Sequence, residues 1–269
     1  MARMGQVVDS EAGVDLYSSV SGKKIKRDSM SLFSILITDD DAIRQPLPDP
    51  VMNNINSFKK FHAGHEHHLF DRASIVKLIS DHFGQEVLSS FQALKPYAYQ
   101  ADLARYCLLY QYGGIYADLS YFFVESCALD SERISVFRDF MRSSPWDTCI
   151  GLIAAPPRHK ALAKAIELVC ANVRKHYYGP TSLCPTGPSL FGKAVALTCE
   201  PEDLIAGESV WSVRRIAGIK VSRKAGHCLF SSDRLIAIKR KTGGDPLTRL
   251  GITNGNEYNK LWQAREVYR

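Results

Sequence analysis

The sequence lacks a long hydrophobic run, and this absence limits where the protein can reside. No stretch approaches the roughly 20 apolar residues that a membrane-spanning helix requires. The first residues, MARMGQVVDSEAG, lack the apolar core of a secretory signal. We therefore expect a cytoplasmic protein or one that is peripheral to a membrane, and export by a dedicated machine stays open.

The sequence also lacks paired cysteines. Its cysteines are odd in number and scattered, without a CxxC pair or a histidine spacing suited to zinc: Cys107, Cys127, Cys149, Cys170, Cys184, Cys199 and Cys228. A secreted protein stabilised by disulfides would normally pair its cysteines. The pattern therefore predicts reduced thiols in the core and a reducing compartment.

Basic residues interleaved with stacking aromatic side chains, which nucleic-acid binding requires, are absent. The net charge is only +6, and Lys and Arg gather near the two ends, at Lys23, Lys24, Lys26, Arg27, Lys239, Arg240 and Lys241. We expect these side chains to lie in solvated loops, with attraction to an anionic partner as the alternative. No nucleic-acid partner is predicted.

What is present is the composition of an ordinary α/β protein, with 45% hydrophobic and 23% charged residues. The length suffices for a full core. Residues 1–29 are polar and basic and predict a flexible N-terminal arm, so we expect a single domain over residues 30–269. Alternating helix-like and strand-like patterns predict a mostly parallel central sheet flanked by helices, with a smaller C-terminal extension.

The apolar periodicity gives the expected elements. Strands are predicted over residues 31–38, 65–70, 115–124 and 148–154, with short strands within 204–238. Helices are predicted over residues 51–61, 75–83, 86–94, 101–112, 131–141, 159–176 and 190–197, with a short one from residue 259. Thr186, which precedes Gly187 and Pro188, is expected to cap the helix over residues 190–197.

Four histidines lie close together in the sequence, at His62, His65, His67 and His68. Their spacing matches no common metal site, and acidic partners nearby are sparse. We therefore assign no metal to this cluster.

The stretch from Pro96 to Ser126 changes its hydrophobic period at Gly113 and Gly114, from a helix to a buried strand. Glycines supply the positive φ that ends a helix. The strand carries Asp118 near its end, and in α/β sheets ligands bind beyond the carboxyl ends of the strands. Asp39, after the first strand, is expected at the same edge as Asp118.

On the predicted helix, Asp102 and Arg105 are three residues apart and share one face. They can form a surface ion pair, or they can bind a ligand together. The combination with Gly113, Gly114 and Asp118 favours ligand binding.

The segment ADLARYCLLYQYGGIYADLS resembles the sugar-binding region of the DXD-containing glycosyltransferases of family 32, which is similar to the catalytic domains of large glucosylating toxins. The matching positions are Ala101, Asp102, Arg105, Tyr112, Gly113, Gly114, Tyr116 and Asp118. Thr186, Gly187 and Pro188 resemble a late turn of the family, and the segment with Tyr258 and Trp262 resembles its aromatic C-terminal segment. The first strand diverges from the family pattern.

The resemblance implies a GT-A-like, Rossmann-type fold and a retaining transfer of a sugar from a nucleotide-diphosphate sugar. It implies that Asp102, Arg105 and Asp118 are the catalytic-site residues and contact the donor, together with Tyr116, Ser120 and Trp262. A divalent ion, Mn²⁺ or Mg²⁺, would neutralise the diphosphate leaving group. The expected acceptor is a saccharide of a surface glycan, as in polysaccharide biosynthesis, or a protein side chain.

The chain departs from the family pattern at Ser120, where the second aspartate of the motif is expected. A neutral hydroxyl is a weaker ligand for a hard cation than a carboxylate. Asp118 and Ser120 would hold the metal with water and a C-terminal group, Asn254, Asn256 or Glu257. Alternatively, the enzyme is metal-independent, or the chain is a noncatalytic nucleotide-sugar-binding or protein-interaction module that has lost turnover.

Overall fold

The computed structural model describes residues 31–139, 144–211, 215–216, 219–220, 227–239, 250–252 and 256–269. The expected N-terminal arm lies outside these residues. The helices are α1 (Asp49–Phe61), α2 (Arg72–His82), α3 (Gln85–Ala93), α4 (Tyr97–Tyr112), α5 (Lys160–Arg174), α6 (Pro188–Thr198) and α7 (Tyr258–Gln263), with a 3-10 turn at Pro201–Asp203. The strands are β1 (Ser31–Ile35), β2 (Glu66–Phe70), β3 (Gly114–Ala117), β4 (Tyr121–Phe123), β5 (Ile134–Arg138), β6 (Thr148–Ala155), β7 (Leu204–Trp211), β8 (Arg215–Ile216), β9 (Ile219–Lys220), β10 (His227–Ser231) and β11 (Arg234–Lys239).

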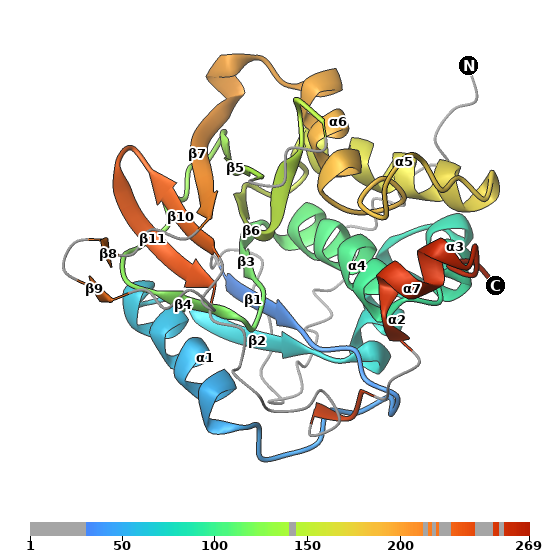
Figure 1. Ribbon diagram of the computed structural model, residues 1–269, viewed down its shortest axis with the longest axis horizontal. Helices are drawn as coiled ribbons and strands as arrows, with labels where there is room; N and C mark the ends of the chain where they lie inside the picture. Colours follow the sequence, from blue (N-terminus) through green and yellow to red (C-terminus); the bar gives the residue numbers. More distant parts are fainter. Residues whose placement is uncertain are drawn as a thin grey trace.

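One large sheet organises the molecule, in the order β2-β1-β3-β6-β5-β7-β10-β11-β4 (Figure 1). Helices cover it, so the expected α/β class is confirmed. The sheet is mixed rather than mostly parallel: β2, β1 and β3 run parallel, as do β5 and β7, and the other neighbours are antiparallel. The expected C-terminal extension is part of the same sheet, because β10 and β11 pair within it.

Alternate residues of the central strands face two different layers of the core. Phe33 of β1 and Tyr116 of β3 pack with the helical layer that contains α4 and α5. Their neighbours Leu32 and Ile115 pack on the opposite face, with Phe58 of α1. This period of two is that of a strand buried on both faces. Helix α1 therefore lies on one side of the sheet and α4 and α5 lie on the other (Figure 1).

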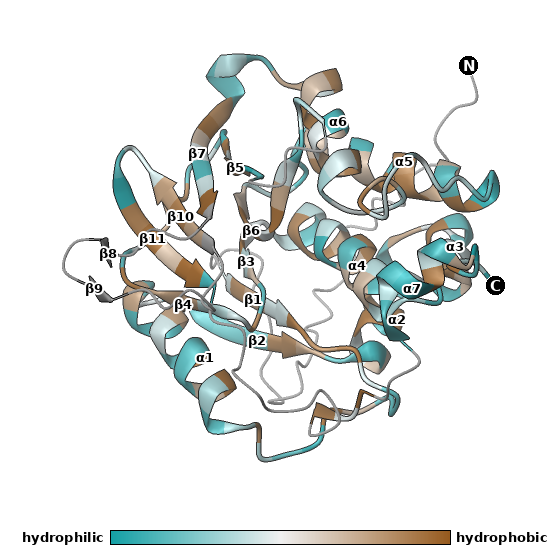
Figure 2. Cartoon of the chain, viewed as in Figure 1, coloured by the Kyte–Doolittle hydropathy of each residue, from teal (hydrophilic) through white to brown (hydrophobic). Residues whose placement is uncertain are grey.

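Hydropathy varies along the strands as well as across them. Figure 2 shows β2 changing from hydrophilic at its start to hydrophobic at its end. The first two residues of β2 are half-buried and the last three, from His68 to Phe70, are buried. Strand β2 is therefore more deeply buried at its carboxyl end than at its start.

Helix α4 is the central helix, and most of its residues are buried. It ends at Gly113, whose φ is 65°, and Gly114 follows with φ of 98°. A Cβ atom at Gly114 would lie 2.2 Å from the carbonyl oxygen of Ser31, so only glycine lets β3 begin this close to β1. The expected helix, glycine break and strand are confirmed.

The strand predicted over residues 115–124 is interrupted. It divides into β3 and β4 around a turn at Asp118, where the backbone N–H of Tyr121 donates to the carbonyl of Asp118 at 3.0 Å. Although β3 and β4 are consecutive, β4 pairs with β11 at the far end of the strand order. The sheet therefore curls back on itself, and the Asp118 turn lies where its two parts meet.

One predicted helix is wrong. The sequence pattern favours a helix over residues 131–141, but Ile134–Arg138 form β5, which pairs with β6 and β7 in the middle of the sheet. Ile134, Val136 and Phe137 are β-branched or aromatic, and both faces of β5 are buried. Packing on both faces outweighs a weak local helix pattern.

The cysteines are free thiols, and five of them are buried, as expected: Cys107, Cys127, Cys149, Cys170 and Cys228.

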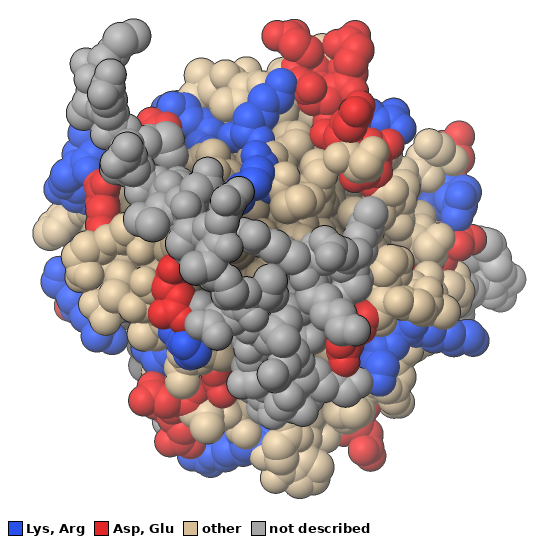
Figure 3. Space-filling model, turned by 180° about the vertical axis from the view of Figure 1, so that it is seen from behind, with Lys and Arg blue, Asp and Glu red and all other residues tan. Residues whose placement is uncertain are grey.

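Across the described helices, none is both long and apolar enough to cross a bilayer. Figure 3 shows Lys and Arg interspersed with Asp and Glu on the face drawn there.

Candidate functional site

Asp102 and Arg105 form a buried ion pair within α4. The guanidinium Nη2 of Arg105 lies 2.9 Å from Oδ1 of Asp102, and the side chains of Arg105 and Asp102 are 6% and 9% exposed, respectively. Arg105 also donates to the carbonyl of Ile150 on β6 at 2.7 Å. The surface alternative for this pair is therefore wrong: both charges are held inside the protein, where each depends on the other.

Asp118 joins this pair from the turn between β3 and β4. Its Oδ1 accepts from Nη1 of Arg105 at 3.2 Å and from the Tyr116 hydroxyl at 2.8 Å. The Tyr116 ring lies beneath the guanidinium, with Cζ of Arg105 4.6 Å from its centre. The Asp118 side chain keeps 27% of its surface exposed. Asp118 is thus held in place by two hydrogen bonds, and it is the member of the charged cluster with the most solvent-exposed side chain.

Thr186 completes the buried part of the site. Its hydroxyl donates to Oδ2 of Asp102 at 2.7 Å, and its carbonyl accepts from the Tyr106 hydroxyl at 2.8 Å. The expectation that Thr186 caps α6 is wrong, because the N-cap is Gly187 and no side chain bonds there. Thr186 and α4 are fixed to each other instead.

Burial sets the ionisation of the site. Removal from water raises the pKa of Asp102 to about 6, although Arg105 and the Thr186 hydrogen bond oppose this shift. Burial also raises the pKa of Tyr116 well above its ordinary value, so its hydroxyl stays protonated and donates to Asp118. At neutral pH Asp102 is therefore mostly ionised beside the Arg105 guanidinium.

The expectation that Lys239 lies in a solvated loop is wrong, because this lysine lies on β11 and belongs to the site. It is the last residue of β11 and pairs in register with Tyr121 of β4. Its Nζ lies 3.7 Å from Oδ2 of Asp118 and 5.4 Å from the centre of the Tyr121 ring. No sequence motif marks Lys239, and it lies beside Asp118 because β11 pairs with β4. A prediction that β11 pairs with β4 would have placed Lys239 near Asp118.

The backbone of β6 shapes the floor of the site. The Asp118 N–H donates to the carbonyl of Gly151 at 2.8 Å. A Cβ atom at Gly151 would lie 2.7 Å from Cε2 of Tyr121 and 2.8 Å from Oδ2 of Asp118. Glycine at this position lets the Asp118 turn pack directly against β6.

Two of the other expected metal-binding residues, Asn256 and Glu257, have partners elsewhere. Ser120 is half-buried in the same turn as Asp118. Asn256 accepts from the N–H of Tyr97 at the start of α4 and donates to the carbonyl of Lys95 at 3.1 Å, so both ends of its amide bind backbone. Glu257 pairs with Lys260 at 2.9 Å. Asn254 lies outside the described residues.

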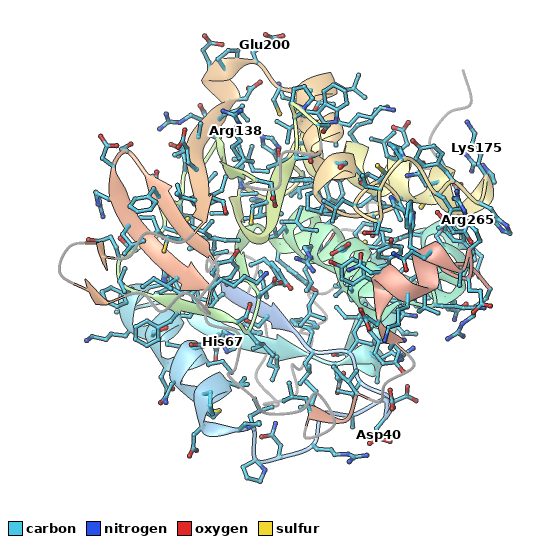
Figure 4. The ribbon with its side chains drawn as sticks, in the orientation of Figure 1. Asp40, His67, Arg138, Lys175, Glu200 and Arg265 are labelled. Carbon is cyan, nitrogen blue, oxygen red and sulfur yellow. The ribbon has the colours of Figure 1, made fainter. Side chains whose placement is uncertain are left out.

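Trp262 and Asp39 also form hydrogen bonds with residues outside the Asp102, Arg105 and Asp118 cluster. The Trp262 indole donates to the carbonyl of Tyr178 at 2.9 Å. Arg265, labelled beside α7 in Figure 4, lies over the rings of Tyr178 and Trp262 at 4.5 and 5.5 Å. Asp39 accepts from the Tyr97 hydroxyl at 2.8 Å. None of these contacts involves Asp118.

His62 and His67 of the histidine cluster lie in buried surroundings. The Nδ1 atom of His62 lies 2.9 Å from the carbonyl of Phe58, and its Nε2 accepts from the N–H of Cys127 at 2.9 Å. Burial lowers the pKa of His67, labelled on β2 in Figure 4, to about 3, so this ring is neutral. His62 thereby links the end of α1 to Cys127, and His67 lies 3.2 Å from the hydroxyl of Ser34 on β1.

The donor set around Asp118 does not fit a divalent cation. Such an ion takes about six oxygen ligands and favours carboxylates. Here Oδ1 of Asp118 already accepts from two donors, Oδ2 faces the ammonium of Lys239, and position 120 carries a hydroxyl. Within the described ranges, no group of three or more His, Cys, Asp or Glu side chains could hold a metal. The ligand set expected for Mn²⁺ or Mg²⁺, with Asn256 and Glu257, is not assembled.

Comparisons with known proteins bear on this site. Residues 48–136 match the family model described as a glycosyltransferase sugar-binding region containing DXD motif. A search of curated proteins finds no significant match. Among solved structures, the PaToxG glycosyltransferase aligns at 15% identity and a TM-score of 0.49, covering 63% of this chain and 69% of that chain. A cysteine-to-serine transferase mutant aligns at 11% identity and a TM-score of 0.28, covering 55% and 80%.

The matched region holds Asp102, Arg105 and Asp118, and it ends within β5. Residues 48–136 are therefore similar to the sugar-binding region of the DXD-containing glycosyltransferases.

Proposed function

We propose that the protein is a glycosyltransferase that moves a sugar from a nucleotide-diphosphate sugar to a saccharide or protein hydroxyl. The observation that carries this proposal is the linked cluster of Asp102, Arg105 and Asp118 within the matched region. Its buried end is fixed by hydrogen bonds, and its Asp118 end is open to solvent. A carboxylate held in this way can accept hydrogen bonds from sugar or ribose hydroxyls without first reorganising.

The three charged groups have different roles in this proposal. Asp118 contacts the donor, because it is the exposed member of the cluster. Arg105 fixes Asp118 and supplies positive charge on the phosphate side, and Asp102 keeps Arg105 in place from within α4. Tyr116 is buried and donates to Asp118, so it acts as a positioning residue rather than as a donor contact.

We propose that the transfer retains the anomeric configuration. An inverting reaction commonly uses a carboxylate base to deprotonate the acceptor hydroxyl. Asp102 is enclosed and paired with Arg105, and Asp118 accepts from two donors, so neither is suited to that task. A reaction in which the leaving phosphate oxygen takes the acceptor proton needs no such base and occurs on one face of the sugar. The site then acts by placing the substrates and stabilising the leaving group.

The test is to incubate the purified full chain with a panel of nucleotide-diphosphate sugars and measure hydrolysis and transfer to saccharide and protein acceptors. We expect turnover on at least one donor, and we expect Asp118→Asn to reduce it by about a hundredfold, as for loss of a transition-state contact. Asp81→Asn, which changes an exposed aspartate paired with Lys77 on α2, is the matched control and should retain turnover.

The noncatalytic alternative predicts a different result. A nucleotide-sugar-binding module would bind a donor but give no hydrolysis or transfer with any acceptor, including cell extract. Binding without turnover would therefore replace the transferase proposal with that module. Product analysis by NMR tests the stereochemistry separately, since a product of inverted configuration would contradict retention.

A further inference from the structure

Asp118 lies between two cationic side chains, and this arrangement is unusual for a residue expected to bind a metal. Arg105 reaches Oδ1 from the buried side at 3.2 Å. Lys239 faces Oδ2 from β11, with Nζ at 3.7 Å. A divalent cation on Oδ2 would have to lie beside the ammonium of Lys239, and the two like charges would repel each other.

Among the described residues, the ammonium of Lys239 contacts the Asp118 carboxylate and the Tyr121 ring, and it has N–H donors left for a further partner. Its distance of 3.7 Å from Oδ2 allows an ion pair and is too long for a hydrogen bond. The Tyr121 ring supports it at 5.4 Å, and the side chain is 26% exposed. An ammonium carries three N–H donors. Lys239 can therefore donate to an anionic group that approaches from solvent while it remains beside Asp118.

The charges of the cluster make Lys239 necessary for an anionic ligand. Asp102 and Asp118 carry negative charge, and Arg105 and Lys239 carry positive charge. Without Lys239 the cluster has a net negative charge, and its exposed group is a carboxylate. A diphosphate would then be repelled unless another cation entered with it.

We propose that Lys239 takes the place of a divalent cation in this site: it binds the diphosphate of the donor and compensates the charge of the leaving group, so that donor binding is independent of metal. This inference rests on the proposed function and adds how the same site binds its diphosphate. It also accounts for Ser120, because a second carboxylate at that position is needed only where a metal must be held.

Binding of free nucleoside diphosphates tests this inference without any requirement for turnover. ADP, GDP, CDP and UDP are each titrated calorimetrically into the full chain, with excess EDTA and separately with Mn²⁺. At least one should bind equally well under both conditions. Lys239→Gln should weaken that binding by at least about tenfold, as expected for loss of a charge-assisted hydrogen bond.

Matched variants separate the role of Lys239 from general effects of charge. Arg234→Gln removes a cation at the other end of β11, where Arg234 pairs with Glu125 at 3.1 Å, and should leave binding unchanged. Lys239→Arg retains the charge and should retain more binding than Lys239→Gln. The double variant Ser120→Asp with Lys239→Gln should bind only when Mn²⁺ is present, because it restores the second carboxylate and removes the competing ammonium.

The outcomes are distinct. If the wild type binds a nucleoside diphosphate only with Mn²⁺, the inference is overturned. It is also overturned if Lys239→Gln binds as tightly as the wild type. Neither result contradicts the proposed glycosyltransferase activity. No binding of any nucleoside diphosphate under either condition overturns the inference, and the turnover assay with nucleotide-diphosphate sugars then decides on the proposed function separately. Thermal melting establishes that each variant is folded. If Lys239→Gln does not fold, the wild-type titrations and Lys239→Arg decide the matter.

Discussion

Arg105 and Asp118 form a hydrogen bond between two separate parts of the fold, with Nη1 of the guanidinium 3.2 Å from Oδ1 of the carboxylate. The first residue comes from the middle of α4 and the second from the turn after β3. Because Arg105 also pairs with Asp102 and donates to Ile150, one side chain links the central helix, the turn and β6. The stability of the fold and the geometry of the site therefore depend on the same residue.

Arg105→Met should destabilise the protein strongly. Removing one partner of a buried pair leaves an uncompensated charge, here on Asp102, and typically costs about 3–5 kcal/mol. The free energy of unfolding in urea measures the effect. The control is Arg133→Met, which breaks an exposed pair with Asp130 and should cost less than about 1 kcal/mol. Adding Asp102→Asn to Arg105→Met should recover part of the loss, and a further loss of similar size would contradict the pairing.

The raised pKa of Asp102 predicts a pH dependence of stability. Burial raises this pKa from 3.8 to about 6, so the folded protein binds the proton more tightly than the unfolded chain does. The contribution of Asp102 is thus present below pH 3.8 and is lost as the pH rises through about 6. The stability of the wild type relative to Asp102→Asn should fall over this range, by on the order of 1–3 kcal/mol.

Asp203 provides a control of opposite sign. The hydrogen bond from Lys160 lowers the pKa of Asp203, so its contribution is present at higher pH and is lost as the pH falls. Chemical denaturation of the wild type, Asp102→Asn and Asp203→Asn across the acidic range gives both differences. Parallel pH profiles for the wild type and Asp102→Asn would show that Asp102 has an ordinary pKa.

The sequence predicted the parts of the site that are local in the chain. Asp102 and Arg105 share a helix face, and the glycine break positions Asp118 soon after them, so spacing alone is informative. Helices α1 to α5 each overlap a predicted helix, although α2 and α4 begin three and four residues earlier than predicted. The same reasoning left open a surface position for the ion pair of Asp102 and Arg105, which is wrong. Apolar periodicity does not reveal that other elements cover α4 on nearly every side.

The parts that the sequence missed come from distant segments. Lys239 reaches Asp118 only because β11 pairs with β4, and Thr186 reaches Asp102 only because the loop before α6 packs on α4. The prediction of β5 as a helix failed for a related reason, because its burial between β6 and β7 depends on strands far along the chain. Local patterns carry no information about such pairings.

Tyr116→Phe should reduce turnover while changing stability little. The variant loses one hydrogen bond to Asp118, which is worth about 1 kcal/mol of stability, and keeps the ring beneath Arg105. With one of its two restraints removed, Oδ1 of Asp118 becomes mobile, and turnover should fall by about tenfold. Steady-state kinetics on the donor found in the panel measures this change.

Tyr268→Phe is the matched control for Tyr116→Phe. Tyr268 is also buried, and its hydroxyl donates to the carbonyl of Tyr177, away from the site. It should lose similar stability and keep full turnover. If the two variants have equal turnover, Tyr116 does not position Asp118.

Gly151→Ala should disturb the site through packing alone. The added Cβ would lie 2.8 Å from Oδ2 of Asp118 and 2.7 Å from Cε2 of Tyr121, so the Asp118 turn must move away from β6. Such overpacking typically costs about 1–3 kcal/mol. Because Tyr121 also supports Lys239, the displacement should change both charges that face the donor. We expect turnover to fall by about tenfold or more, since catalysis depends on sub-ångström placement.

Gly84→Ala is the control for Gly151→Ala, because no atom lies within 4 Å of the position that the added methyl group would take, and the φ of Gly84 is not positive. It should cost less than about 1 kcal/mol and leave turnover unchanged. Calorimetric titration of the bound nucleoside diphosphate adds a second measurement, in which Gly151→Ala should weaken binding and Gly84→Ala should not. Wild-type turnover and binding in Gly151→Ala would show that Asp118 and Lys239 tolerate a displaced turn, and the close packing on β6 would then serve the fold alone.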